Sequence, residues 1–134
     1  MGSMPDGGGE VVGAIGKSAS GAGKVAVQMK RVILESPYAG DTERNVAYAR
    51  RCLRDSLLRG EAPIASHLLY TQDGVLDDND SSERQRGIDA GLAWLAAACA
   101  SVVYVDLGIS KGMAYGIAAA ERAGLPVEYR KIEA

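Results

Sequence analysis

Short apolar runs that alternate with segments of helical periodicity are the feature that most constrains the fold of this chain. The expected strands are residues 31–35, 62–66, 101–106 and 127–132. Between them, apolar side chains recur every three or four residues, as the buried face of a helix requires. Such alternation predicts right-handed crossovers and a parallel sheet covered on both faces. We therefore expect an α/β, flavodoxin- or Rossmann-like three-layer sandwich, with a parallel sheet of roughly four to five strands in the order 2-1-3-4.

Capping residues predict where the helices begin and end. Asp41 or Thr42 begins the first helix, and Gly60 stands where its C-terminal cap belongs. Ser82 begins the second helix with an S-x-x-[EQ] capping box, and the third runs from the turn at residues 108–112 to Gly124. The expected apolar stripes are Val46, Ala49, Leu53 and Leu57 on the first helix, and Ile88, Leu92, Leu95 and Cys99 on the second.

Residues 1–28 differ from the rest of the chain because they are rich in Gly and Ser. Such a segment buries little apolar surface, so we interpret it as a flexible leader. It is either an upstream extension or a segment added to the protein, and the domain is expected to span residues 29–134. Residues 18–25 resemble the P-loop G-x-x-x-x-G-K-[ST], but Ser18 replaces its first glycine and Val25 replaces its last hydroxyl residue.

Charge and composition exclude several classes of function. A formal net charge of −2 gives no basic footprint for nucleic acid or an anionic membrane. No apolar run approaches the roughly 20 residues of a membrane span. One histidine and two cysteines, Cys52 and Cys99, do not make a Cys/His metal site, and we expect both thiols to be reduced and buried in a cytoplasmic protein. The acidic residues 73–80 do not fit a calcium loop, so we expect no metal.

Two carboxylates stand at the predicted ends of neighbouring strands. In open parallel sheets, ligands bind outside the carboxyl ends of the strands, where the winding direction reverses. Glu35 and Asp106 fall there and are the candidate catalytic residues, as an acid/base pair, a nucleophile or ligands of ribose hydroxyls. The structural alternative is that Glu35 caps nearby amides and Asp106 begins a turn.

Further polar groups follow the same strand ends. Tyr38 could stack on a base, and His67 could form a hydrogen bond with a base or phosphate. The turn that begins at Gly108 opens a helix whose free N–H groups attract anions. The alternatives are loop packing, a structural histidine and a plain N-cap. The candidate ligand-binding residues are Tyr38, Gly40, His67, Gly108, Ser110 and Gly112.

Several of these segments are similar to those of a known family. They are residues 36–40 (SPYAG) after the first strand, residues 64–67 (IASH) at the end of the second, and residues 110–113 (SKGM) and 124–127 (GLPV) around the third helix. Their order and spacing over residues 29–132 resemble the nucleoside 2-deoxyribosyltransferase-like family, including its small phage and bacterial relatives.

The resemblance implies cleavage or transfer at an N-glycosidic bond of nucleosides or nucleotides, without metal or organic cofactor, by a homo-oligomer. In that family, a glutamate four residues after the helix-opening glycine is the nucleophile. Gly116 holds that place here. One hypothesis is an enzyme whose carboxylate has moved to Glu35 or Asp106. A second is a non-catalytic sensor or sequestering protein for a nucleotide-derived ligand, and a third is a scaffold for protein contacts.

Overall fold

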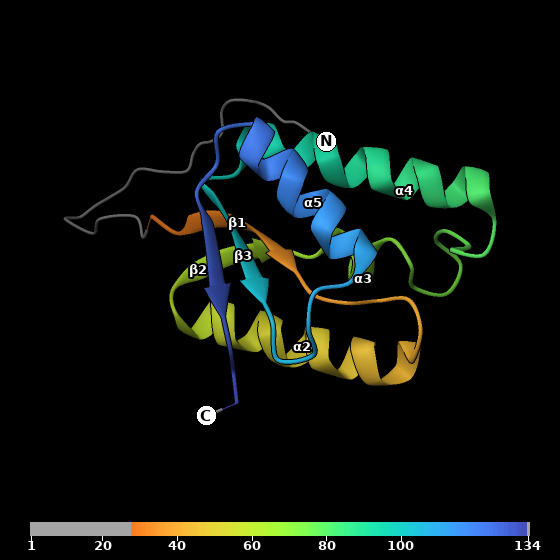
Figure 1. Cartoon of the computed structure of the whole chain (residues 1–134), viewed down its shortest axis with the longest axis horizontal. Coiled ribbons are helices and arrows are strands. Elements are labelled where there is room, and N and C mark those ends of the chain that lie inside the picture. The colour runs from red at the N-terminus through yellow and green to blue at the C-terminus, as the bar shows by residue number, and fades with distance from the viewer. Residues whose placement is uncertain (1–27, 134) are drawn as a thin grey trace, which may run out of the picture.

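The computed structural model describes residues 28–133 (Figure 1). The elements follow in the order β1 (Lys30–Glu35), α2 (Thr42–Leu58), β2 (Glu61–Ile64), α3 (Ser66–Leu69), α4 (Ser81–Ala93), η1 (Trp94–Ala97), β3 (Ala100–Tyr104), α5 (Lys111–Arg122) and β4 (Val127–Arg130). The predicted leader, with the P-loop-like residues 18–25, lies outside the described residues except for Gln28.

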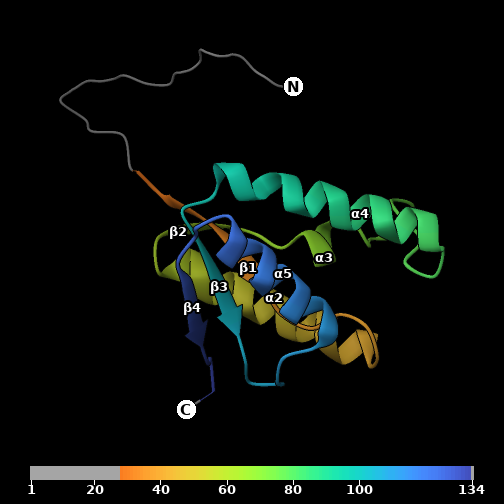
Figure 2. The ribbon, with the colours of Figure 1, turned by 45° about the horizontal axis from the view of Figure 1, so that its top comes forward.

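The four strands form one parallel sheet in the order β2-β1-β3-β4, which confirms the predicted fold class and strand order. Helix α2 lies on one side of the sheet, and α5 crosses the other side over β1 and β3, with α4 beside it (Figures 1 and 2). Since all strands run the same way, their carboxyl ends meet at one edge. Within residues 28–133, no helix has the length and apolar character of a membrane span.

Strand periodicity divides the core between the two faces of the sheet. On β1, Val32 and Leu34 point toward α2, where they pack with Tyr48 and Cys52. On β3, Val103 points the other way and packs with the α5 residues Met113 and Ile117. Because successive strand residues alternate between faces, Ile33 and Glu35 belong to the face that α5 covers.

The predicted ends of α2 and α5 are confirmed. The Asp41 carboxylate accepts a hydrogen bond from the backbone N–H of Arg44, and Gly60 follows α2 at a φ of +86°. Ser110 caps α5 by accepting from the backbone N–H of Met113, and Gly124 follows that helix at a φ of +78°.

Three details of the helix predictions were wrong. The N-cap of α4 is Asp80 rather than Ser82, because the Asp80 carboxylate accepts from the backbone N–H groups of Ser82 and Glu83. The buried face of α2 is formed by residues about one position before those of the predicted stripe, so that Leu57 is 52% exposed. The residues that α2 buries are Asn45, Tyr48, Ala49, Cys52 and Ser56.

The third wrong detail concerns α4, in which no residue is buried. This helix packs on α3 rather than deep against the sheet, and Gly91 allows the approach because its missing Cβ would meet the Ser66 hydroxyl at 2.5 Å. The apolar residue Ile88 is therefore 36% exposed. Cys99, expected in the core, is exposed, whereas Cys52 is buried as predicted.

Candidate functional site

The carboxyl group of Glu35 lies directly against Gly116. Glu35 ends β1 on the face covered by α5, and Gly116 is in the second turn of that helix. A Cβ atom built on Gly116 would lie 2.8 Å from Cδ of Glu35 and closer still to Oε2. Carbon atoms without a bond between them do not approach so closely, so the glycine makes room for the carboxyl group.

The surroundings of Glu35 favour its neutral form. No hydrogen bond or ion pair to its carboxyl group occurs within residues 28–133, and the side chain is half-buried. Burial raises the pKa of Glu35 to about 8. A half-buried carboxyl group without partners and with a raised pKa at a strand end has the environment of a reacting group.

Ser36 and His67 meet beside Glu35. The Ser36 hydroxyl oxygen lies 2.7 Å from Nε2 of His67. Ser36 is 3% exposed, and His67 is half-buried in the short helix α3, which begins where β2 has ended. The sequence predicted that β2 would continue to Ser66, but the strand ends at Ile64. Burial lowers the pKa of His67 to about 4, so the ring is neutral near pH 7.

Asp106 ties three segments together. Its Oδ1 accepts hydrogen bonds from the Tyr48 hydroxyl at 2.5 Å and from the backbone N–H of Ile132 at 3.1 Å. Its Oδ2 accepts from the backbone N–H of Glu133 at 3.0 Å. Burial by itself would raise the pKa of Asp106, but these donors lower it below its ordinary value. The carboxylate thus holds the C-terminal segment to α2, and a catalytic role for it stays a prediction.

The first crossover loop is held by a residue that sequence reasoning missed. Asn45, which is 1% exposed, donates from Nδ2 to the backbone carbonyls of Tyr38 and Ala39, both at 3.0 Å. The Tyr38 side chain is half-buried, and Gly40 has a φ of +99°, a conformation that favours glycine. These contacts fix the backbone of the loop that follows Glu35.

The β3–α5 turn has the predicted form of a helix start. Gly108 has a φ of +87°, and its N–H donates to the carbonyl of Val105. The Ser110 hydroxyl accepts from Met113 N–H at 3.2 Å, so it caps α5. Gly112 is exposed in the first turn of that helix. In the described part of the chain, no hydrogen bond joins Ser110 to Glu35 or His67.

The sequence offered signals for Ser36, which was not predicted, and for the place of Gly116 in α5. Ser36 directly follows Glu35, and Gly116 stands in the small-residue series at 112, 116, 120 and 124. Small side chains at such a spacing let a helix pack close to a sheet, and Ala120 on α5 is 0% exposed. Gly116 instead accommodates a polar side chain, which no spacing pattern indicates.

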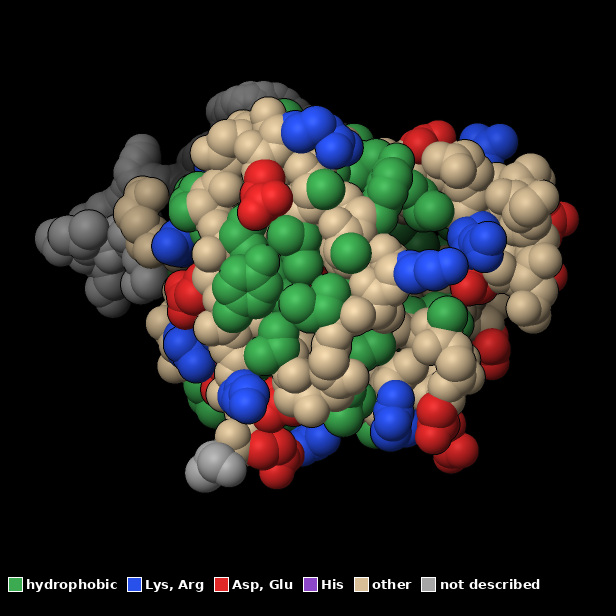
Figure 3. All heavy atoms as spheres, in the orientation of Figure 1, with side chains coloured by type: hydrophobic (Ala, Val, Ile, Leu, Met, Phe, Trp, Pro, Cys, Tyr) green, Lys and Arg blue, Asp and Glu red, His purple; other side chains and the backbone are tan. Residues whose placement is uncertain are grey.

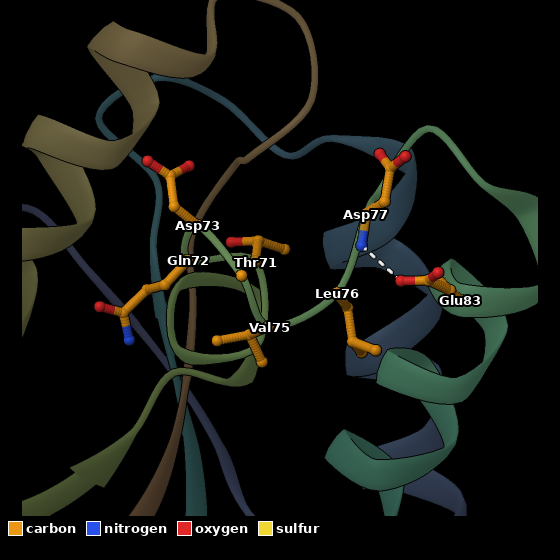
Figure 4. A pocket seen from close by; sticks show the side chains of 8 residues that line it. Thr71, Gln72, Asp73, Val75, Leu76, Asp77 and Glu83 are labelled. Atoms are coloured by element: carbon orange, nitrogen blue, oxygen red, sulfur yellow. Dashed lines mark hydrogen bonds between the residues drawn. The ribbon is translucent and has the colours of Figure 1, made fainter.

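The surface of the molecule is hollowed in places. In the orientation of Figure 3 it is recessed between α5 and α4, where hydrophobic side chains line much of the recess. An open hollow of about 450 Å³ lies farther along the chain, between residues 71–77 and Glu83 (Figure 4). Its wall is fixed by the bond from Asp77 N–H to Glu83 Oε1 at 2.8 Å. Glu35, Ser36 and His67 do not line this second hollow.

Comparisons with known proteins agree with this architecture. A 2-deoxyribosyltransferase from the psychrotolerant bacterium Bacillus psychrosaccharolyticus has a similar fold, with a TM-score of 0.55 and 18% sequence identity. The alignment covers 75% of this chain and 72% of that enzyme. No curated protein matches the chain. Residues 30–130 match the model of a family described as a domain of unknown function, DUF7768. The chain therefore belongs to the DUF7768 family.

Proposed function

We propose that this protein acts on the N-glycosidic bond of a small nucleoside or nucleotide, with the Glu35 carboxyl group as the reacting group. The observation that carries the proposal is the position of that group over Gly116. The resemblance in sequence assigns the nucleophile of deoxyribosyltransferase-like enzymes to position 116. In this chain, a carboxyl group from β1 lies where the side chain of residue 116 would begin.

The fold supports the same proposal. The 2-deoxyribosyltransferase with a similar fold is an enzyme of nucleosides, and its likeness spans most of both chains. A fold alone does not determine chemistry, so the proposal depends on the side chains at the strand ends. Glu35 is half-buried and free of partners within residues 28–133, whereas both oxygens of Asp106 accept hydrogen bonds. We therefore assign the reaction to Glu35 and a structural role to Asp106.

The reaction follows from the carboxylate form of Glu35. An Oε atom attacks C1′ of the sugar, the C1′–N bond breaks, and its electron pair leaves with the base, which takes a proton from water. Water, or a ring nitrogen of a second base, then attacks C1′. The C1′–Oε bond breaks, its electron pair returns to the Glu35 carboxylate, and the attacking group gives its proton to solvent, which completes hydrolysis or transfer. Because burial raises the pKa of Glu35 to about 8, the reactive form becomes abundant only as the pH approaches and passes that value.

The experiment is to incubate the protein with the 2′-deoxynucleosides and their 5′-monophosphates and to measure free base by chromatography. We expect release by the wild type, loss of release in Glu35→Gln, and retention in the surface control Glu43→Gln. Ligand binding without release would favour the sensor or sequestering protein. Neither binding nor release with any compound would contradict the proposal.

Association of copies of the chain is part of the proposal. Helix α4 and its neighbours leave apolar side chains exposed, with Leu69 and Trp94 each at 43%. Burying such residues against a second copy would recover about 25 cal/mol for each Å² of apolar surface. We expect a homo-oligomer in sedimentation velocity, and Trp94→Glu should shift the distribution toward monomer. A monomer at all concentrations would contradict this part.

A further inference from the structure

The contact between Ser36 and His67 carries information about where the histidine proton lies. A neutral imidazole has one N–H donor and one acceptor nitrogen. His67 is neutral near pH 7, since burial lowers its pKa to about 4. The ring nitrogen 2.7 Å from Ser36 Oγ is Nε2, so that nitrogen is either the donor or the acceptor of the bond.

The hydroxyl of Ser36 decides between the two forms. Ser36 is 3% exposed, and within residues 28–133 its hydroxyl has His67 Nε2 as its hydrogen-bond partner. If Nε2 carried the proton, it would donate to Oγ, and the hydroxyl hydrogen would be buried without an acceptor. Leaving a buried donor unpaired is unfavourable, because the group has lost its hydrogen bonds to water. The arrangement that satisfies both groups has the Ser36 O–H donate to Nε2, which leaves the ring proton on Nδ1.

The Nδ1–H group is then available to a ligand. No acceptor for it occurs in the described part of the chain, and His67 is half-buried rather than enclosed. A neutral N–H donor suits a carbonyl oxygen or an unprotonated ring nitrogen, the acceptor atoms that nucleobases carry.

We propose that Ser36 is a positioning residue that fixes His67 as the Nδ1–H tautomer, so that His67 donates a hydrogen bond to an acceptor atom of the bound base. The ligand contact rests on the proposed function, whereas the tautomer does not. Ser36 is not a nucleophile activated by His67, because its buried hydroxyl cannot reach a substrate. Its role is to orient the imidazole, as second groups commonly do for functional histidines.

The chain has one histidine, which makes the tautomer directly measurable. Long-range ¹H–¹⁵N correlation spectra at pH 7, on ¹⁵N-labelled protein freed of any histidine tag, distinguish the two ring nitrogens without assignment. We expect a protonated Nδ1 and an unprotonated Nε2 in the wild type. Ser36→Ala should convert the ring to a mixture or to the Nε2–H form. A wild-type ring protonated at Nε2, or a tautomer that Ser36→Ala leaves unchanged, would overturn the proposal.

Two isosteres of histidine test the ligand contact. Asn carries an N–H near the place of Nδ1, and Gln carries one near the place of Nε2. With the 2′-deoxynucleoside from which the wild type releases most base, we expect His67→Asn to keep kcat/KM within about threefold and His67→Gln to lose about tenfold, the effect of one hydrogen bond. The reverse order, or equal losses, would overturn the ligand contact.

A double-mutant cycle separates positioning from packing. Asn has no tautomers, so Ser36→Ala should lower kcat/KM in the wild type and leave His67→Asn unchanged. An equal loss in both backgrounds would mean that Ser36 acts through packing and would overturn its positioning role. If the wild type releases no base, the proposed function fails, and the NMR spectrum still decides the tautomer. The isosteres are then compared by the shift in melting temperature with the same 2′-deoxynucleosides.

Discussion

The carboxyl group of Glu35 occupies the space that a side chain at Gly116 would fill, with Cδ 2.8 Å from the position of the missing Cβ. A strand residue and a helix residue thus depend on each other. Glu35 has room for its carboxyl group because residue 116 has no side chain. Position 116 has a carboxyl group beside it because Glu35 extends across from β1. This dependence gives substitutions at the two positions distinct outcomes.

Gly116→Ala should reduce base release by at least about tenfold without destabilising the protein. The added methyl group displaces the end of a flexible side chain, while alanine favours a helix over glycine by about 1 kcal/mol. Urea unfolding and the release assay measure the two effects. Gly87→Ala in α4 is the matched control, because a Cβ there meets only the side-chain end of Leu76, at 3.2 Å. Full activity in Gly116→Ala would show that the carboxyl position is unimportant.

Glu35→Gln should make the protein more stable while removing activity. The folded state holds the pKa of Glu35 at about 8, above its ordinary value of 4.5, so the unfolded state loses its proton first as the pH rises. Stability is therefore lost between pH 4.5 and 8, and Gln removes this loss. We expect a gain of about 1–3 kcal/mol at pH 8 and little change at pH 4, measured by urea unfolding. A variant less stable than the wild type at pH 8 would assign Glu35 a structural role.

His67 should make the fold sensitive to acid. The folded pKa of about 4 lies below the ordinary value of 6.5, so the unfolded chain takes up a proton first as the pH falls. The stability that depends on neutral His67 is complete above pH 6.5 and is lost on the way to pH 4. We expect His67→Gln to show a flatter pH dependence of unfolding free energy over this range. Parallel curves for variant and wild type would contradict this prediction.

Much of the architecture was predictable because its signals are local. Strand-like runs, caps at Asp41 and Ser110, and glycines at 60 and 124 determine the element order, and parallel crossovers then imply the strand order. The rotation of α2 was not predictable from apolar spacing, since Tyr48 and Ser56 are buried through hydrogen bonds to Asp106 and Glu61. Those partners lie 58 and 5 residues away along the chain.

The candidate site was predictable only as a set of strand ends. The rule for parallel sheets indicates Glu35, His67 and Asp106, but it does not say which side chain reaches which. Ser36 and His67, which form a hydrogen bond, lie 31 residues apart in the chain. Glu35 at the end of β1 contacts Gly116 in α5, a helix that follows β3 much later in the sequence. Such contacts depend on packing, which no single-sequence pattern contains.

A buried ion pair away from the proposed reacting group should determine stability without affecting activity. The Arg130 guanidinium donates to both carboxylate oxygens of Glu61, and the two side chains are 4% and 11% exposed. Glu61→Gln leaves a buried charge with a weaker partner and should cost about 2–4 kcal/mol. Glu128→Gln is the control, because that partner of Arg130 is 51% exposed and should cost less than about 1 kcal/mol. Equal effects in urea unfolding would contradict the prediction.

The most direct test of the account is to move the carboxyl group back to the helix. Base release is measured for the wild type, for Glu35→Ala, for Gly116→Glu and for the double variant Glu35→Ala/Gly116→Glu. We expect each single variant to lose activity, and the double variant to exceed Glu35→Ala by at least about tenfold, since a carboxyl group again occupies the site. A folded double variant no more active than Glu35→Ala would contradict the claim that Glu35 supplies the carboxyl group that position 116 lacks.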